Sequence, residues 1–221
     1  MPLNLVTGGV RSGKSRYAEF LLASEPDVTY VAPDSPRDGA PDPEWSQRVA
    51  AHRAMRPPTW QTVETLDLVP LLRATGGPLL VDCLGRWVTG LVDRAGLWED
   101  LPAARELLDR ERRALVAALA DTQRLVVAVT NEVGWSLVPT TPSGRFFQDE
   151  LGRLNADLGA MTRYIYLVVA GRVLPLGQAE AVPPRRPLPG PPGSPHGGWV
   201  GDRLPDPTTP QDRPGDHPGS R

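Results

Sequence analysis

A glycine-rich segment near the N-terminus restricts the possible folds more than any other feature of the sequence. Residues 8–15 follow the pattern G-x-x-x-x-G-K-[ST], with an apolar run at residues 3–6 before it and helical spacing over residues 14–24 after it. Glycines let successive backbone N–H groups converge on phosphate oxygens, and a helix N-terminus adds partial positive charge. The segment therefore predicts a phosphate-binding loop (P-loop) between a strand and a helix. Its residues are Gly8, Gly9, Val10, Arg11, Ser12, Gly13, Lys14 and Ser15.

Two side chains of this loop have the chemistry that a nucleoside triphosphate and its metal require. Lys14 is the only lysine in the sequence, although the chain has 24 lysine and arginine residues in total. Its ammonium group can reach the β and γ phosphates, and the hydroxyl of Ser15 can ligate Mg²⁺. The alternative is an ordinary glycine-rich turn with a solvated lysine.

Apolar runs alternate with helical patterns along the first three quarters of the chain. This alternation predicts an α/β protein with a mostly parallel, doubly wound sheet, helices on both of its faces, and ligands at the carboxyl ends of the strands. The predicted strands are residues 3–6, 28–32, 79–82, 125–130 and 164–169, and the predicted helices are residues 14–24, 43–56, 101–121 and 144–162.

Composition limits the number of domains and the classes of partner. The 221 residues are enough for one sizeable core, which we assign to residues 1–176. Residues 177–221 are rich in proline and glycine and poor in aliphatic side chains, so we expect a disordered tail. A net charge of -2, one cysteine and no apolar stretch of about 20 residues predict a cytoplasmic protein that binds neither nucleic acid nor membrane.

Polar residues follow two of the predicted strands. Asp82 ends the run 79–82, where a carboxylate could hold Mg²⁺ or cap the next helix. Cys83 reads as a small packed residue rather than a nucleophile, since no histidine is near it in sequence. Residues 130–135 follow the next strand, and a site and a helix cap explain them equally well.

The helix predicted at residues 43–56 carries the one histidine outside the tail, His52. Arg48 lies four residues earlier and shares a helical face with it. A neutral imidazole flanked by guanidinium groups can attack phosphorus, which would make His52 a nucleophile. The alternative that composition favours is a histidine packed with Trp45 and Val49.

Three arginines of the later helical region could bind an anionic substrate. The alternative is a solvated face, which is the usual role of such residues. They are Arg145, Arg153 and Arg163.

Taken in order, five stretches resemble the bifunctional adenosylcobinamide kinase / adenosylcobinamide-phosphate guanylyltransferase family of cobalamin biosynthesis. The resemblance covers residues 3 to about 175, and the ordered set is more specific than a P-loop alone. The stretches are residues 5–16, residues 48–57 with 60–64, residues 81–84 with Trp87, residues 131–134 with 138–139, and residues 152–155.

The resemblance implies a RecA-like P-loop fold, a homo-oligomer that is often a trimer, and two reactions on one corrinoid. First, adenosylcobinamide takes a γ-phosphoryl group from ATP or GTP; then GTP guanylylates a histidine, and the phosphorylated corrinoid takes the GMP. The family's histidine pattern falls on His52, and Mg²⁺ is assigned to Ser15 and Asp82. The implied nucleotide contacts are residues 8–15, Pro33, Asp34, Ser35, Arg53, Ala54, Met55, Arg56, Glu64 and Asp82.

Two other functions fit the same motifs. A small-molecule kinase without a covalent step would keep γ-phosphoryl transfer after the loss of His52. A nucleotide-dependent switch would form nucleotide-dependent complexes and transfer nothing to a corrinoid.

Overall fold

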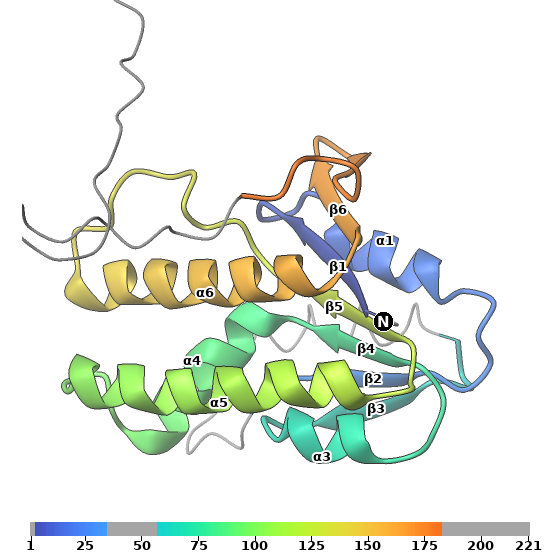
Figure 1. Cartoon of the computed structure of the whole chain (residues 1–221), viewed down its shortest axis with the longest axis horizontal. Coiled ribbons are helices and arrows are strands. Elements are labelled where there is room, and N and C mark those ends of the chain that lie inside the picture. Colours follow the sequence, from blue (N-terminus) through green and yellow to red (C-terminus); the bar gives the residue numbers. More distant parts are fainter. Residues whose placement is uncertain (1–2, 35–56, 183–221) are drawn as a thin grey trace, which may run out of the picture. The chain divides into compact units, whose positions relative to one another are not determined.

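The computed structural model of the chain describes residues 3–34 and 57–182 (Figure 1). Its strands are β1 (Leu3–Gly8), β2 (Thr29–Ala32), β3 (Gln61–Glu64), β4 (Leu79–Asp82), β5 (Val126–Val129), β6 (Tyr164–Val169) and β7 (Arg172–Pro175). Its helices are α1 (Lys14–Leu21), α3 (Leu68–Arg73), α4 (Leu84–Ala95), α5 (Leu101–Asp121) and α6 (Pro142–Met161).

All seven strands form one sheet in the order β3-β2-β4-β5-β1-β6-β7. The first six strands in this order run parallel, and β7 is antiparallel to β6. The prediction of a mostly parallel sheet is therefore confirmed, and each of the five predicted strands belongs to it. β3 and β7 were not predicted because they lie at the two edges with largely exposed side chains, so neither has the apolar run of a buried strand.

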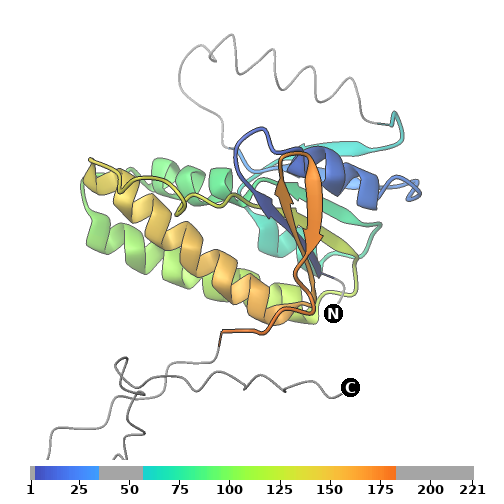
Figure 2. The same ribbon diagram turned by 90° about the horizontal axis from the view of Figure 1, so that it is seen from above.

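Side chains of the central strands point alternately to the two faces of the sheet. In β4, Leu79 and Val81 pack on one face and Leu80 on the other. Helices α3, α4, α5 and α6 cover the first face, and α1 covers the second with Ala18 (Figure 2). Because both faces are covered, these strands are apolar throughout rather than alternately apolar and polar. The prediction of helices on both faces is confirmed.

The two long helices begin at capping residues. Asp100 accepts a 3.1 Å hydrogen bond from the backbone N–H of Ala103 at the start of α5, and Thr141 accepts one of 3.1 Å from Gly144 at the start of α6. The predicted helix 101–121 has the observed bounds of α5. The short α3 and the helix α4 were not predicted, and the helix predicted at 43–56 lies outside the described residues.

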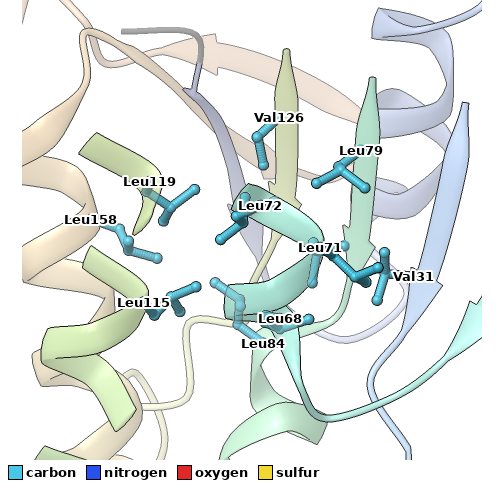
Figure 3. A pocket seen from close by; sticks show the side chains of 12 residues that line it. Val31, Leu68, Leu71, Leu72, Leu79, Leu84, Leu115, Leu119, Val126 and Leu158 are labelled. Carbon is cyan, nitrogen blue, oxygen red and sulfur yellow. The ribbon is translucent and has the colours of Figure 1, made fainter. Parts of the chain in front are cut away.

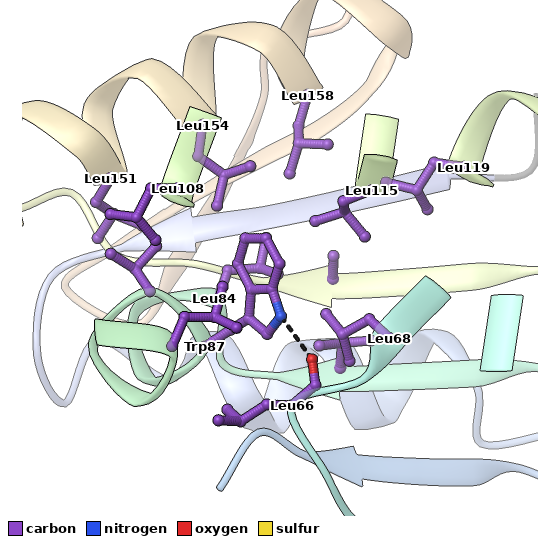
Figure 4. Packing of buried hydrophobic residues seen from close by; sticks show 14 of the residues in the cluster. Leu66, Leu68, Leu84, Trp87, Leu108, Leu115, Leu119, Leu151, Leu154 and Leu158 are labelled. Atoms are coloured by element: carbon purple, nitrogen blue, oxygen red, sulfur yellow. Dashed lines mark hydrogen bonds between the residues drawn. The ribbon is translucent and has the colours of Figure 1, made fainter. Parts of the chain in front are cut away.

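Trp87 of α4 is at the centre of the larger core. Its indole ring is 2% exposed, and its Nε1–H donates a 2.9 Å hydrogen bond to the carbonyl oxygen of Leu66 (Figure 4). Leucines of α5 and α6 surround it from the other side. The bond satisfies the one polar atom of the ring, so this large side chain can be fully buried.

A small cavity between the sheet and helices α3, α5 and α6 is lined by aliphatic side chains alone (Figure 3). Its volume of about 10 Å³ is hardly enough for one water molecule, and it has no polar group that could orient a ligand. This cavity is therefore not a ligand site. None of the helices in residues 3–34 and 57–182 has the length and apolar character needed to span a membrane.

Candidate active site

The carboxyl ends of five parallel strands bring most of the predicted site residues to one edge of the sheet. Along this edge the order is Glu64 at the end of β3, Pro33 and Asp34 after β2, Asp82 at the end of β4, residues 130–132 after β5, and the P-loop after β1. Neighbouring strands are about 4.8 Å apart. Asp82 is therefore roughly 10 Å from β1, and Glu64 roughly 19 Å.

The P-loop passes from β1 to α1 through a backbone that ordinary residues rarely adopt. Gly13 has φ +99° and Arg11 has φ +57°, so the chain turns twice through the left-handed region. Gly8 has φ +155°, and a Cβ there would lie 2.4 Å from the carbonyl oxygen of Val168 on the paired strand β6. The first glycine is thus required by the close approach of two strands.

The loop also has donors arranged for an anion. Lys14 begins α1, and its Nζ donates a 3.2 Å hydrogen bond to the carbonyl oxygen of Gly9, which holds the ammonium group across the loop. The Oγ atom of Ser12 is buried and has no hydrogen-bond partner within the described chain. A phosphate oxygen would satisfy such a group, so the loop fits a nucleotide phosphate.

Asp82 is fixed in place by a residue that sequence reasoning missed. The phenol of Tyr30 on β2 donates a 3.0 Å hydrogen bond to Oδ2 of Asp82. The alternative of a helix cap is wrong, because Cys83 holds the capping position of α4 and no side chain caps that helix. Asp82, and Ser15 in the first turn of α1, carry oxygen atoms of the type that Mg²⁺ prefers, and their role as its ligands stays a prediction.

Asp82 and Ser15 are only two candidate ligands, which is few for most metal ions but enough for Mg²⁺. The described residues contain no group of three or more histidine, cysteine, aspartate or glutamate side chains that could hold an ion. Mg²⁺ is usually bound by one or two carboxylates together with water and phosphate oxygens. The donor set at this edge therefore fits Mg²⁺ that arrives with a nucleotide.

Cys83 has the environment of a packed residue, as predicted. It lies against the smaller core, and its Sγ is 3.7 Å from Nδ2 of Asn131. Burial raises the pKa of its thiol, and the negative charge of Asp82 raises it further, while Lys14 and backbone N–H groups oppose the shift. A thiol that holds its proton is a poor nucleophile.

Residues 130–132 contact the other strands of the edge and cap no helix. Thr130 is fully buried and donates a 2.6 Å hydrogen bond to Asn155 of α6, which in turn donates to the carbonyl oxygen of Asn131. Glu132 accepts a 2.7 Å hydrogen bond from the hydroxyl of Thr7 on β1. The alternative of a cap is wrong, because α6 begins only at Pro142.

An ion pair joins helix α4 to the segment that follows β2. Arg86 of α4 donates a 2.7 Å hydrogen bond to Oδ1 of Asp34, which follows β2. Sequence reasoning did not find this contact, because 52 residues separate the partners. Asp34, whose nucleotide contact stays a prediction, is therefore held by a side chain of α4.

The three later arginines have different surroundings. Arg145 donates to the carbonyl oxygens of Pro139 and Thr140, and Arg153 pairs with the buried Glu150, so these two serve the fold. Arg163 is exposed after the end of α6. The contacts of Arg145 and Arg153 within the fold therefore explain both residues without an anionic substrate.

Several predicted site residues lie outside the described residues. They include the proposed nucleophile and most of its neighbours in the family pattern, and their roles stay predictions. They are Ser35, His52, Arg53, Ala54, Met55 and Arg56.

Comparisons with known proteins identify the family of this chain. Residues 4–176 match the protein-family model described as cobinamide kinase / cobinamide phosphate guanyltransferase. The chain is 38% identical over 177 residues to the bifunctional adenosylcobalamin biosynthesis protein CobU of Escherichia coli (strain K12). The aligned region covers 76% of this chain and 95% of that protein. It is 37% identical over 182 residues to the protein of the same name from Salmonella typhimurium, with coverage of 76% and 95%. It is 39% identical over 178 residues to the bifunctional adenosylcobalamin biosynthesis protein CobP of Pseudomonas aeruginosa, with coverage of 78% and 96%.

Proposed function

Because the chain belongs to the cobinamide kinase / cobinamide phosphate guanyltransferase family, we propose that the P-loop edge of its sheet serves both reactions of that family on one corrinoid. The chain is a bifunctional enzyme of cobalamin biosynthesis, a kinase and a guanylyltransferase. Its substrate in the first reaction is adenosylcobinamide, with ATP or GTP as phosphoryl donor. GTP is the donor of GMP in the second.

The kinase step is proposed to depend on the P-loop and on Asp82. The convergent N–H groups of residues 8–15 and the ammonium of Lys14 would bind the β and γ phosphates. Ser15 and Asp82 would hold Mg²⁺, which supplies charge neutralisation between those phosphates when bound. The side chain of Tyr30 orients Asp82 toward this edge through the 3.0 Å bond.

The guanylyl transfer is proposed to proceed through His52. The imidazole nitrogen attacks the α-phosphorus of GTP, a P–N bond forms, and pyrophosphate leaves. An oxygen of the corrinoid phosphate then attacks the same phosphorus, the P–N bond breaks, and adenosylcobinamide-GDP is released. A phosphoramidate keeps a good leaving group, so two easier displacements replace one difficult one.

One observation carries the proposal for a shared site. The strand order β3-β2-β4-β5-β1 aligns the P-loop, Asp82, Asp34 and Glu64 on a single edge. A nucleotide whose phosphates occupy the P-loop therefore has further predicted contacts along the same line. The homotrimer and the contacts of Ser35 and residues 53–56 belong to the proposal on the strength of the resemblance alone.

Intact-mass measurement after incubation with GTP and MgCl₂ tests the covalent step. We expect wild-type protein to gain the mass of one GMP, and GTP labelled at the α-phosphate to leave acid-labile, base-stable label. His52→Ala should gain nothing, and His196→Ala, which replaces a histidine of the C-terminal region, should behave as wild type. Label retained by His52→Ala would defeat the assignment of His52.

A second variant tests whether the two reactions share phosphate binding. Lys14→Ala should reduce both the kinase and the guanylylation rates, by about 100-fold, because positioning of the triphosphate is common to them. Rates that stay at wild-type values for either reaction would contradict the shared site. A wild-type protein that phosphorylates adenosylcobinamide but never acquires GMP would be a kinase without the covalent step.

A further inference from the structure

Glu132 is a carboxylate next to the P-loop that neither proposed reaction has used. Its Oε1 accepts a 2.7 Å hydrogen bond from the hydroxyl of Thr7, and its backbone N–H donates a 3.3 Å bond to the carbonyl oxygen of Gly8. Thr7 is 5% exposed and immediately precedes the first glycine of the P-loop. Two bonds therefore fix Glu132 relative to the start of the phosphate-binding loop.

The strand order makes Glu132 the nearest of the edge carboxylates to that loop. β5 pairs directly with β1, whereas β4, which carries Asp82, is one strand further away. Glu64, on β3, is separated from β1 by three strands. Asp82 is also assigned to Mg²⁺, and an oxygen of it is already bonded to Tyr30. Of these three groups, Glu132 is the one placed to act on a molecule that approaches the γ-phosphate.

One oxygen of Glu132 remains available for a ligand. Within residues 3–34 and 57–182, the side chain of Glu132 has Thr7 as its hydrogen-bond partner and no ion pair with arginine or lysine. Oε2 therefore stays open in this part of the chain, and the side chain is only partly buried. A carboxylate that is oriented but not neutralised has the properties of a general base.

The kinase step needs such a base. Its acceptor is an alcohol of the corrinoid, and an alcohol oxygen that bonds to phosphorus must lose its proton. The transfer of GMP to the corrinoid phosphate has no such need, because the attacking oxygen already carries negative charge. The two reactions should thus differ in their dependence on a carboxylate.

We propose that Glu132 is the general base of the kinase step, an inference that rests on the proposed function. As the alcohol oxygen attacks the γ-phosphorus, the bond from that phosphorus to the β–γ bridging oxygen breaks, and the nucleoside diphosphate leaves. The alcohol proton passes to Oε2 of Glu132. Thr7 keeps the carboxylate in the orientation that this transfer requires.

The variant Glu132→Gln shows whether Glu132 accepts a proton in the kinase step or only supports the P-loop. The amide oxygen of glutamine can still accept the hydrogen bond from Thr7, but the side chain can no longer take a proton. We expect the kinase kcat to fall by about 100-fold or more, as for the loss of a general base, with the KM for ATP changed less than about threefold. Glu132→Asp should recover part of the rate. Glu106→Gln, on an exposed position of α5, is the matched control and should equal wild type.

Guanylyl transfer is the internal control, because the proposed base acts only in the kinase step. Glu132→Gln supplied with GTP should acquire GMP at the wild-type rate, and it should convert adenosylcobinamide phosphate to adenosylcobinamide-GDP as wild type does. Thr7→Val should lower the kinase kcat more than Thr7→Ser, because serine retains the hydroxyl. Thermal unfolding of each variant shows whether the fold is intact.

Two results would overturn the role of Glu132. One is a Glu132→Gln kinase rate within threefold of wild type; the other is an equal loss of kinase, guanylylation and ATP binding, which indicates support of the P-loop. A wild-type protein that transfers no phosphoryl group to adenosylcobinamide would instead refute the proposed function, and with it this step. The wild-type assay therefore distinguishes the two failures.

Discussion

Tyr30 and Asp82 stand on neighbouring strands, and the phenol of Tyr30 donates a 3.0 Å hydrogen bond to Oδ2 of Asp82. Tyr30 is paired in register with Leu80, so Asp82 lies two residues further along the same face of β4. A long aromatic side chain can bridge this diagonal. The proposed metal ligand is thus oriented by a residue of a different strand.

Replacing Tyr30 by phenylalanine should weaken metal binding without unfolding the protein. Loss of a partner that orients a metal ligand costs about 10- to 100-fold in metal affinity or activity. We expect the Mg²⁺ concentration for half-maximal kinase rate to rise by about tenfold, as measured by titration with MgCl₂. Tyr164→Phe, an exposed position of β6, is the control. An unchanged Mg²⁺ dependence would show that Tyr30 has no role in metal binding.

Gly8→Ala should distort the start of the P-loop. The new Cβ would lie 2.4 Å from the carbonyl oxygen of Val168 and 2.9 Å from Oγ of Ser12, so the strands or the loop must shift. Such overpacking costs about 1–3 kcal/mol of the free energy of unfolding. Gly9→Ala is the matched control, because nothing lies within 4 Å of a Cβ there. Urea unfolding that gives equal stability for both variants would contradict the predicted clash.

The thiol of Cys83 should react slowly with iodoacetamide. Burial raises its pKa above the ordinary value, and the charge of Asp82 acts in the same direction. The folded protein therefore holds this proton more tightly than the unfolded chain does. Its contribution to stability is complete below the pKa of the unfolded chain and is lost as the pH rises through the folded value. The alkylation rate at pH 8, measured by intact mass, should be below that of the urea-unfolded protein. Equal rates would mean that the thiol is exposed.

Glu150 provides a test of a buried charge. It is 2% exposed, and its Oε1 accepts hydrogen bonds of 3.0 Å from Arg105 and 2.7 Å from Arg153. Each arginine is nearly half exposed, so either alanine variant alone should lower the free energy of unfolding by about 1 kcal/mol or less. The double variant leaves the carboxylate unpaired and should cost about 3 kcal/mol, well above the sum.

Urea unfolding of the two single variants, the double variant and wild type gives this coupling directly. Arg113→Ala, an exposed position of α5, is the control for loss of a surface arginine. Additive losses would show that solvent, rather than the second arginine, compensates the carboxylate.

The P-loop and the central strands could be read directly from the sequence. The glycine and lysine spacing is local, and buried parallel strands are continuous apolar runs, so both signals lie within a few residues. The helix 101–121 was also predicted with its observed bounds, because its apolar spacing is local too. β3, β7 and α3 escaped prediction because short, exposed or proline-containing elements have no such periodicity.

In the candidate site, too, some residues could be predicted from the sequence and others could not. Lys14, Ser15 and Asp82 were predicted from motif and position, while the partners Tyr30 and Thr7 were not. Thr7 and Glu132 are 125 residues apart in the chain, and they meet because β5 inserts between β4 and β1. Sequence patterns identify the side chains that can bind phosphate or metal, because this ability depends on the residue type and on its neighbours in the chain. Which of these groups face one another depends on the order of strands in the sheet, and packing over the whole chain sets that order.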